Sequence, residues 1–116
     1  MLMQIILRMM SKVLNILVAD DDLFFRSFMC KMIEDMGHKT SQAADGDECI
    51  IYAKKNQYDA IFLDLIMPTL CGDEVLKMLR NEQNYNGMIV ICSAEDENEL
   101  MQEYFDLGAN AYLAKP

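Results

Sequence analysis

The sequence predicts a single α/β domain in which a parallel β-sheet is covered by helices on both faces. Short, nearly continuous apolar runs recur along the chain, as is typical of strands that are buried on both faces. Between these runs the apolar residues recur every three or four positions, which is the period of an amphipathic helix. Alternating strands and helices with short connections form a doubly wound sheet with right-handed crossovers. The 116 residues suffice for one hydrophobic core.

Five strands are expected from the apolar runs, and the second of them is the weakest. In chain order they are Ile16–Ala19, Lys39–Ala44, Ala60–Leu63, Met88–Cys92 and Ala111–Ala114. Four helices are expected between them, from apolar side chains at helical spacing. These helices span residues 22–36, 46–56, 72–82 and 96–107. Gly37 and Gly108 directly follow the first and the last helix, where glycine commonly ends a helix.

The composition excludes some functions and favours others. The formal net charge is −9, and the ten Lys and Arg residues are scattered along the chain. A nucleic-acid surface needs a basic patch, so we expect no direct binding to nucleic acid. An acidic chain is better suited to a site that recruits a cation.

The four cysteines indicate a reducing compartment. They form no C-x-x-C pair, and His38 is the only histidine, so a zinc site is poorly supported. Three cysteines lie in apolar strand or helix patterns, which predicts small buried side chains and a cytoplasmic protein. Cys71 is expected in a loop, where its thiol could react.

Residues 1–9 are expected to be an N-terminal extension to a domain at 10–116. The segment is apolar, but Gln4 and Arg8 interrupt it, and it lacks a basic start and a small-residue cleavage site. We therefore expect neither a signal peptide nor a membrane span. Translation starting at Met9 or Met10 would explain the segment; if it is made, it would form a short helix or an interfacial tail.

Polar residues follow four of the expected strands, where a parallel sheet places its ligand site. They are Asp20 and Asp21, Asp64, Ser93 and Lys115. Three carboxylates within about 5 Å would repel one another by roughly 3 kcal/mol per pair at an effective dielectric constant of 20. Mg²⁺ together with Lys115 would compensate that charge, because Mg²⁺ prefers oxygen ligands and shares its waters with phosphate groups. We therefore expect phosphoryl chemistry, with Asp64 as the nucleophile and Lys115 and Ser93 holding the phosphoryl oxygens.

Taken singly, each of these residues also has a structural interpretation. Asp22, beside the pair, is best explained as the N-cap of the first helix. Asp64 could be a turn residue before Pro68, Ser93 could be a helix N-cap, and Lys115 could be a solvated lysine at a strand end. Four strand ends that bring complementary groups to one edge of the sheet favour a site.

These residues resemble the receiver domain of response regulators from two-component signal transduction, over residues 14–116. The motifs that carry the resemblance are Asp20-Asp21, Asp64-Leu-Ile-Met-Pro68 with Gly72, Ser93-Ala94, and Gly108 to Pro116. The resemblance implies a flavodoxin-like, five-stranded parallel sheet with the strand order 2-1-3-4-5. It also implies a cytoplasmic phosphoacceptor that assists its own phosphorylation and dephosphorylation rather than an enzyme acting on other substrates.

The resemblance further assigns roles to individual residues. Asp64 would accept a phosphoryl group from the phosphohistidine of a sensor histidine kinase or a phosphotransfer protein. Asp21, Asp64 and the backbone carbonyl of Ile66 would bind Mg²⁺, with Asp20 acting through water.

A switch is also implied by the resemblance. Ser93 would move towards the phosphoryl group, and Tyr112 would rotate into the space that Ser93 leaves. This change would remodel the surface of the fourth helix and the fifth strand, where a downstream effector docks. Ile66 and Glu95 would tune how fast water attacks the acyl phosphate.

The chain departs from the family pattern after Lys115-Pro116. The receiver family continues into a fifth helix, so we expect a domain truncated after the fifth strand, with apolar surface exposed on the first helix and on that strand. This leaves the oligomeric state open, and it leaves open whether the chain is a fragment of a longer regulator. Two other interpretations remain: a haloacid-dehalogenase-like phosphatase using Asp20-Asp21-Asp22, or a receiver-like interaction module that is never phosphorylated.

Overall fold

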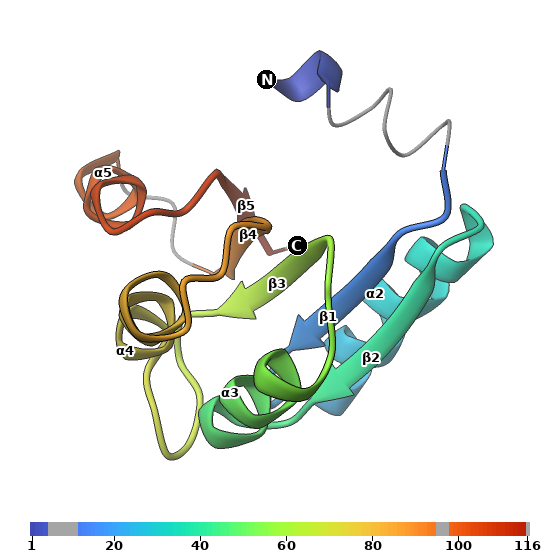
Figure 1. The fold of residues 1–116 in the computed structure, drawn as a ribbon, viewed down its shortest axis with the longest axis horizontal. Coiled ribbons are helices and arrows are strands. Elements are labelled where there is room, and N and C mark those ends of the chain that lie inside the picture. The colour runs from blue at the N-terminus through green and yellow to red at the C-terminus, as the bar shows by residue number, and fades with distance from the viewer. Residues whose placement is uncertain (5–11, 95–97, 116) are drawn as a thin grey trace.

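The computed structural model describes residues 1–4, 12–94 and 98–115, and it contains the predicted sheet. Five parallel strands lie in the order β2-β1-β3-β4-β5 (Figure 1). Their bounds are Asn15–Ala19 for β1, Lys39–Ala43 for β2, Ala60–Asp64 for β3, Met88–Ser93 for β4 and Ala111–Ala114 for β5. The fold class and the strand order expected from the sequence are confirmed.

The helices lie in two layers on either side of the sheet (Figure 1). Their bounds are Leu23–Asp35 for α2, Gly46–Lys55 for α3, Gly72–Lys77 for α4 and Asn98–Asp106 for α5. Helix α4 continues as a π-helical segment, η1, over Met78–Glu82, so the expected helix at 72–82 is α-helical only as far as Lys77. Helix α2 covers one face of the sheet, and α3, α4, η1 and α5 cover the other.

Some sequence-based expectations fall outside the described residues. They concern most of the N-terminal extension at 1–9, the start at Met9 or Met10, Glu95, the beginning of the helix expected at 96–107, and Pro116. Residues 2–4 form a helical turn. Within the described ranges no helix has both the length and the apolar character needed to cross a membrane.

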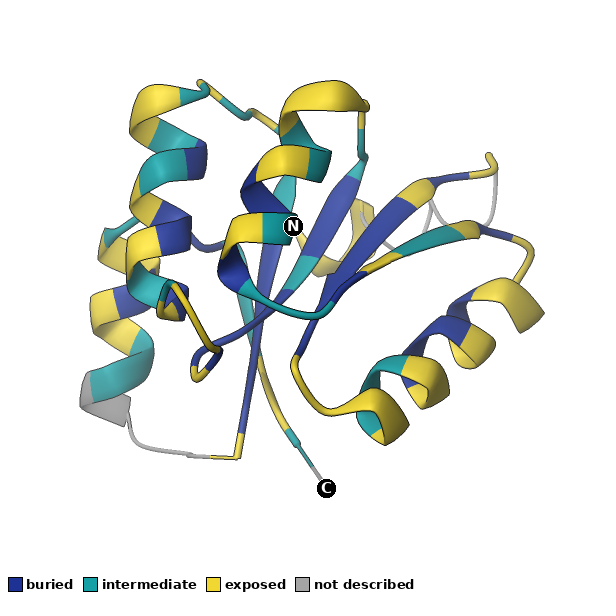
Figure 2. Ribbon diagram, turned by 90° about the horizontal axis from the view of Figure 1, so that it is seen from below, coloured by how far each residue is buried: buried dark blue, intermediate teal, exposed yellow. Residues whose placement is uncertain are grey.

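The larger core lies between the sheet and the α3–α5 layer. Alternate strand residues point into it, among them Leu17, Ile61 and Ile89, and all three are fully buried. Val75 and Leu79 meet them from α4 and η1. Figure 2 shows that the central strands β1, β3 and β4 are buried over most of their length, while the edge strands β2 and β5 and one side of each helix are more exposed. The polar residues lie at the carboxyl ends of β1, β3, β4 and β5.

The opposite face of the sheet is covered less completely. A smaller core of Ile16, Val18, Met29 and Ile33 joins α2 to the sheet, but other apolar side chains face solvent. These are Phe24, Phe28 and Met32 on α2, Met36 at its C-cap and Leu113 on β5, with Phe24 86% exposed. The apolar surface expected on the first helix and the fifth strand is present.

His38 closes the smaller core at the start of β2. The ring is buried, and its Nδ1 accepts a hydrogen bond of 3.1 Å from the backbone N–H of Leu14. The substitution His38→Leu leaves that N–H without an acceptor, and the expected loss is about 1–3 kcal/mol in the free energy of unfolding. Urea denaturation measures this loss. Thr40→Val, which removes an exposed hydrogen bond to Glu34, is the control and should cost under about 0.5 kcal/mol; equal effects of the two variants would contradict the role of His38.

Candidate functional site

The carboxyl ends of β1, β3, β4 and β5 bring the predicted site residues together. Lys115 Nζ lies 2.7 Å from Asp20 Oδ2 and 3.3 Å from Asp64 Oδ1. The backbone N–H of Lys115 donates to the carbonyl of Ser93 at 2.7 Å, which fixes the end of β5 against the end of β4. Asp20, Asp64 and Ser93 are 1%, 6% and 3% exposed. These polar groups form a buried cluster rather than a set of solvated strand ends.

Asp20, Asp21 and Asp64 form an acidic group that suits a divalent cation. Each offers a carboxylate oxygen, and these oxygens lie within 4.8 Å of one another. Asp20 Oδ1 accepts from the N–H of Asp22 at 2.9 Å, while its buried Oδ2 faces the Lys115 ammonium at 2.7 Å. Asp21 is exposed and open to water. An all-oxygen set with one exposed member fits Mg²⁺, which keeps several of its waters.

Asp22 does not belong to this acidic group. Its side chain accepts from the N–H of Phe24 at 3.0 Å and caps α2. The predicted N-cap is therefore confirmed. An Asp-x-Asp phosphatase motif would need Asp22 to face the reacting group, so the cap disfavours that interpretation.

Burial and neighbouring charges shift the pKa values of Asp64 and Lys115. Burial, followed by the charge of Asp20, raises the pKa of Asp64 to about 6 and outweighs the opposing effect of Lys115. Burial alone would lower the pKa of Lys115, but the carboxylates of Asp20 and Asp64 outweigh it and raise that pKa. At neutral pH Asp64 is thus mostly ionised, and the ammonium beside it keeps its proton.

The raised pKa of Asp64 predicts how stability depends on pH without a metal. Between about pH 4 and pH 6 the folded state binds more protons at this group than the unfolded state, so its contribution to stability falls as pH rises. Asp64→Asn removes the charge. In EDTA the unfolding free energy of this variant is expected to exceed that of the parent by about 3 kcal/mol at pH 7.5, with little difference near pH 3.5. Urea denaturation at both pH values tests this; a pH-independent difference would contradict it.

The connection after β3 holds Asp64 in place. Gly72 donates its N–H to the carbonyl of Leu65 at 2.8 Å. A Cβ at Gly72 would lie 2.7 Å from the carbonyl oxygen of Asp64 and 2.7 Å from the Cα of Leu65. The backbone N–H of Ile66 donates to Asp64, whereas the Ile66 side chain is 72% exposed. The loop therefore presents main chain, not side chain, to the acidic group.

Tyr112 occupies a half-buried position on β5. It is paired with Ile91 in the β4–β5 ladder and packs against the larger core, to which α5 contributes Tyr104. Ser93 is buried at the end of β4, opposite Ala114. The two residues predicted to move together thus lie on adjacent strands.

The sequence did not indicate two neighbours of the site that α2 supplies. The Phe25 ring lies 4.5 Å from Lys115 Nζ, in cation–π geometry. Arg26 donates to the backbone carbonyl of Asp20 at 2.6 Å and to Gln42 at 2.9 Å. Phe25 lies in the helix expected at 22–36, and the helical spacing of apolar residues carries no information about a charged partner.

The cysteines behave as the sequence predicted. All four are free; Cys30, Cys49 and Cys92 are buried, and Cys71 is exposed. Burial raises the pKa of the Cys92 thiol to about 12, so the thiol next to the acidic group stays protonated and unreactive.

A family model and an individual relative both match this chain to response regulators. Residues 16–116 match the response regulator receiver domain family. The chain is 34% identical over 103 residues to the transcriptional regulatory protein CiaR of Streptococcus pneumoniae, covering 89% of this chain and 45% of CiaR. It therefore spans less than half of that relative.

Solved structures agree with this match. The receiver domain of the Francisella response regulator 1452 is similar with a TM-score of 0.84 and 40% identity, covering 89% of this chain and 84% of that one. The CheX-CheY-BeF3-Mg+2 complex from Borrelia burgdorferi contains a chain with a TM-score of 0.85 and 27% identity, covering 89% of this chain and 78% of that one.

Proposed function

The chain belongs to the response regulator receiver domain family, and from this membership we propose that it is the phosphoacceptor of a two-component phosphorelay. Asp64 takes the phosphoryl group from the phosphohistidine of a sensor histidine kinase or a phosphotransfer protein. A carboxylate oxygen of Asp64 attacks phosphorus, the P–N bond breaks, and its electron pair returns to the imidazole. The product is an aspartyl phosphate on this chain.

One observation carries this proposal: the buried carboxylate of Asp64 lies beside the Lys115 ammonium and in one group with two further carboxylates. Lys115 Nζ is 3.3 Å from Asp64 Oδ1, and Asp20 and Asp21 place oxygens within 4.8 Å. A nucleophilic carboxylate needs its negative charge, and the transferring group needs positive charge around its oxygens. Lys115 supplies an ammonium for this purpose, and Ser93 supplies a hydroxyl at the end of the adjacent strand.

Mg²⁺ fits the acidic group. Asp21, Asp64 and the backbone carbonyl of Ile66 would bind it, and Asp20 would act through water. When bound, Mg²⁺ neutralises charge on the phosphoryl oxygens. In this assignment Asp20 keeps its short ion pair with Lys115, so one carboxylate orients the ammonium while another performs the attack.

The aspartyl phosphate then acts as a switch. Ser93 moves towards the phosphoryl group and Tyr112 turns inwards, which remodels the surface formed by α5 and β5. Tyr112 is half-buried and packs beside α5 residues of the core, so its rotation changes the packing of that helix. Response regulators interact with histidine kinases and effectors. For this chain we propose a cytoplasmic location, a sensor histidine kinase or phosphotransfer protein as the phosphoryl donor, and an effector that docks on the α5–β5 surface.

Labelling with a small phosphodonor tests the proposed function. The protein is incubated with acetyl phosphate and Mg²⁺, and the modified peptide is located by mass spectrometry. The expected result is one phosphoryl group in the peptide that contains Asp64. A label on Asp20 would instead indicate the phosphatase-like chemistry, and a folded chain that takes no label would indicate an interaction module that is not phosphorylated.

A further inference from the structure

Arg80 is the centre of a hydrogen-bond network at the end of the sheet opposite the site. Its guanidinium donates to the carbonyls of Gly108 at 3.0 Å, Tyr85 at 2.7 Å and Gly87 at 2.8 Å, and to Asn110 Oδ1 at 2.8 Å. The Tyr85 ring lies 5.6 Å from the guanidinium carbon. One side chain therefore joins three segments: η1, the loop before β4 and the turn before β5.

Asn110 extends the pairing of β4 and β5. Its Oδ1 accepts from the backbone N–H of Ile89 at 2.9 Å as well as from Arg80. Its own backbone N–H donates to the carbonyl of Ile89 at 2.9 Å. Asn110 thus bonds both the N–H and the carbonyl of Ile89. This contact lies immediately before the first ladder pair of the two strands, Val90 with Ala111.

The local backbone is shaped to admit Arg80. The π-helical segment η1 contains Arg80, and its turn is closed by a hydrogen bond of 3.0 Å from the N–H of Gln83 to the carbonyl of Met78. Such wide turns are rare and are frequently found at functional positions. Gly108 has a φ of +111°, and a Cβ there would lie 2.9 Å from Arg80 Cγ. Glycine at this position provides both the left-handed turn and the space for the arginine stem.

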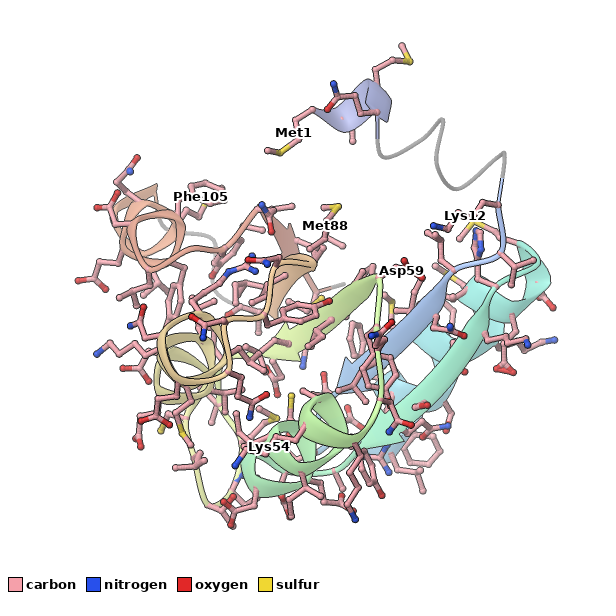
Figure 3. All side chains as sticks on the ribbon, in the orientation of Figure 1. Met1, Lys12, Lys54, Asp59, Met88 and Phe105 are labelled. Carbon is pink, nitrogen blue, oxygen red and sulfur yellow. The ribbon has the colours of Figure 1, made fainter. Side chains whose placement is uncertain are left out.

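The network and the site lie at opposite ends of the same two strands. Met88, labelled in Figure 3 together with Asp59 and Lys12, marks the network's end of the sheet, where β4 begins. Ile89, which Asn110 holds, lies four residues before Ser93 on β4, a distance of about 13 Å along the strand. β5 is an edge strand with one neighbour, so its position depends on how it is held at its two ends.

We infer that Arg80 and Asn110 are positioning residues for phosphoryl transfer: they fix β4 and β5 against each other and thereby set the separation of the Ser93 hydroxyl and the Lys115 ammonium. This inference rests on the proposed function. The carboxylates that would bind Mg²⁺ are carried by β1 and β3 instead. Disturbing the network should therefore impair the phosphoryl-holding groups and leave the metal-binding groups in place.

The test compares two substitutions of Asn110. Asn110→Asp keeps an acceptor oxygen for both Arg80 and the N–H of Ile89, whereas Asn110→Leu removes it. The expected result for Asn110→Leu is a loss on the order of tenfold in the rate of labelling by acetyl phosphate, because small displacements of positioning groups have large effects on rate. Its Mg²⁺ affinity should stay within about twofold of the parent, and Asn110→Asp should match the parent in both measurements.

Several outcomes would overturn this inference. A parent-like labelling rate in Asn110→Leu, or equal losses in labelling rate and Mg²⁺ affinity, would reduce the network to a general structural role. If Asn110→Leu fails to fold, Arg80→Lys replaces it, because lysine keeps the charge but cannot reach all four acceptors.

A second readout separates this inference from the proposed function. If the parent chain takes no label, the proposed function fails, but the positioning role is still tested by amide hydrogen exchange. Asn110→Leu should speed exchange of the Lys115 amide, which is bonded to the Ser93 carbonyl, and leave amides in the centre of β1 unchanged. Unchanged exchange at Lys115 would contradict the positioning role.

Discussion

Asp64→Asn is expected to abolish labelling by acetyl phosphate in the presence of Mg²⁺. The amide has nearly the shape of the carboxylate but is not a nucleophile, and it withdraws one of the charges that hold the cation. Asp20, the other buried carboxylate of the acidic group, is held by both the Lys115 ammonium at 2.7 Å and the N–H of Asp22 at 2.9 Å, so we expect no substitute label on it. Intact-mass measurement before and after incubation gives the result directly.

Asp22→Asn is the matched control for this prediction. Asn caps helices about as well as Asp, and Asp22 serves as the cap of α2. This variant should fold with nearly unchanged stability and take the full label. Undiminished labelling of Asp64→Asn would disprove the phosphoacceptor assignment, and loss of the label in both variants would trace the effect to net charge instead of position.

Gly72→Ala is expected to lower the unfolding free energy by about 3 kcal/mol, the upper part of the range for a forced backbone shift. The new Cβ would lie 2.7 Å from the backbone of both Asp64 and Leu65, and neither can swing away as a flexible side chain would. The strand end that carries Asp64 must move. We therefore expect the labelling rate to fall together with stability, as measured by urea denaturation and by acetyl phosphate kinetics.

Gly37→Ala is the contrasting substitution. Gly37 has a φ of +95°, and a Cβ added there would meet nothing within 4 Å, so alanine costs only the left-handed conformation, about 1–2 kcal/mol. It lies far along the chain from the site residues and should not change the labelling rate per folded molecule. Equal stability of Gly72→Ala and the parent would show that the loop after β3 yields more easily than its contacts imply.

The strands and their polar ends were predictable because both depend on local sequence. A strand such as Met88–Ser93, buried on both faces, requires a continuous apolar run, and the first polar residue after it marks the edge of the sheet. The apolar pattern of the expected strand at Lys39–Ala44 is the weakest because β2 lies at an edge of the sheet and buries only Ala43. A strand with so little burial does not need a continuous apolar run. Asp22 could be identified as a cap because capping depends on neighbouring residues.

The features that the sequence did not reveal depend on contacts between segments that are distant along the chain. The periodicity of residues 72–82 predicts a regular helix, yet the chain widens into a π-turn where Arg80 reaches Gly108, which lies 28 residues further along the sequence in the turn before β5. Arg26 and Phe25 acquire their roles only once α2 lies beside the acidic group. Neither the spacing nor the residue type reveals such partners before the fold is known.

The ammonium of Lys115 also has a mechanical consequence. It contacts the carboxylate of Asp20, directly after β1, and that of Asp64 at the end of β3. β5 forms no ladder with either strand, so this ion pair links the edge strand to the middle of the sheet. Breaking either contact removes a tie between the edge strand and the middle of the sheet. The carboxyl-terminal end of β5 is therefore held by electrostatics as well as by its ladder with β4.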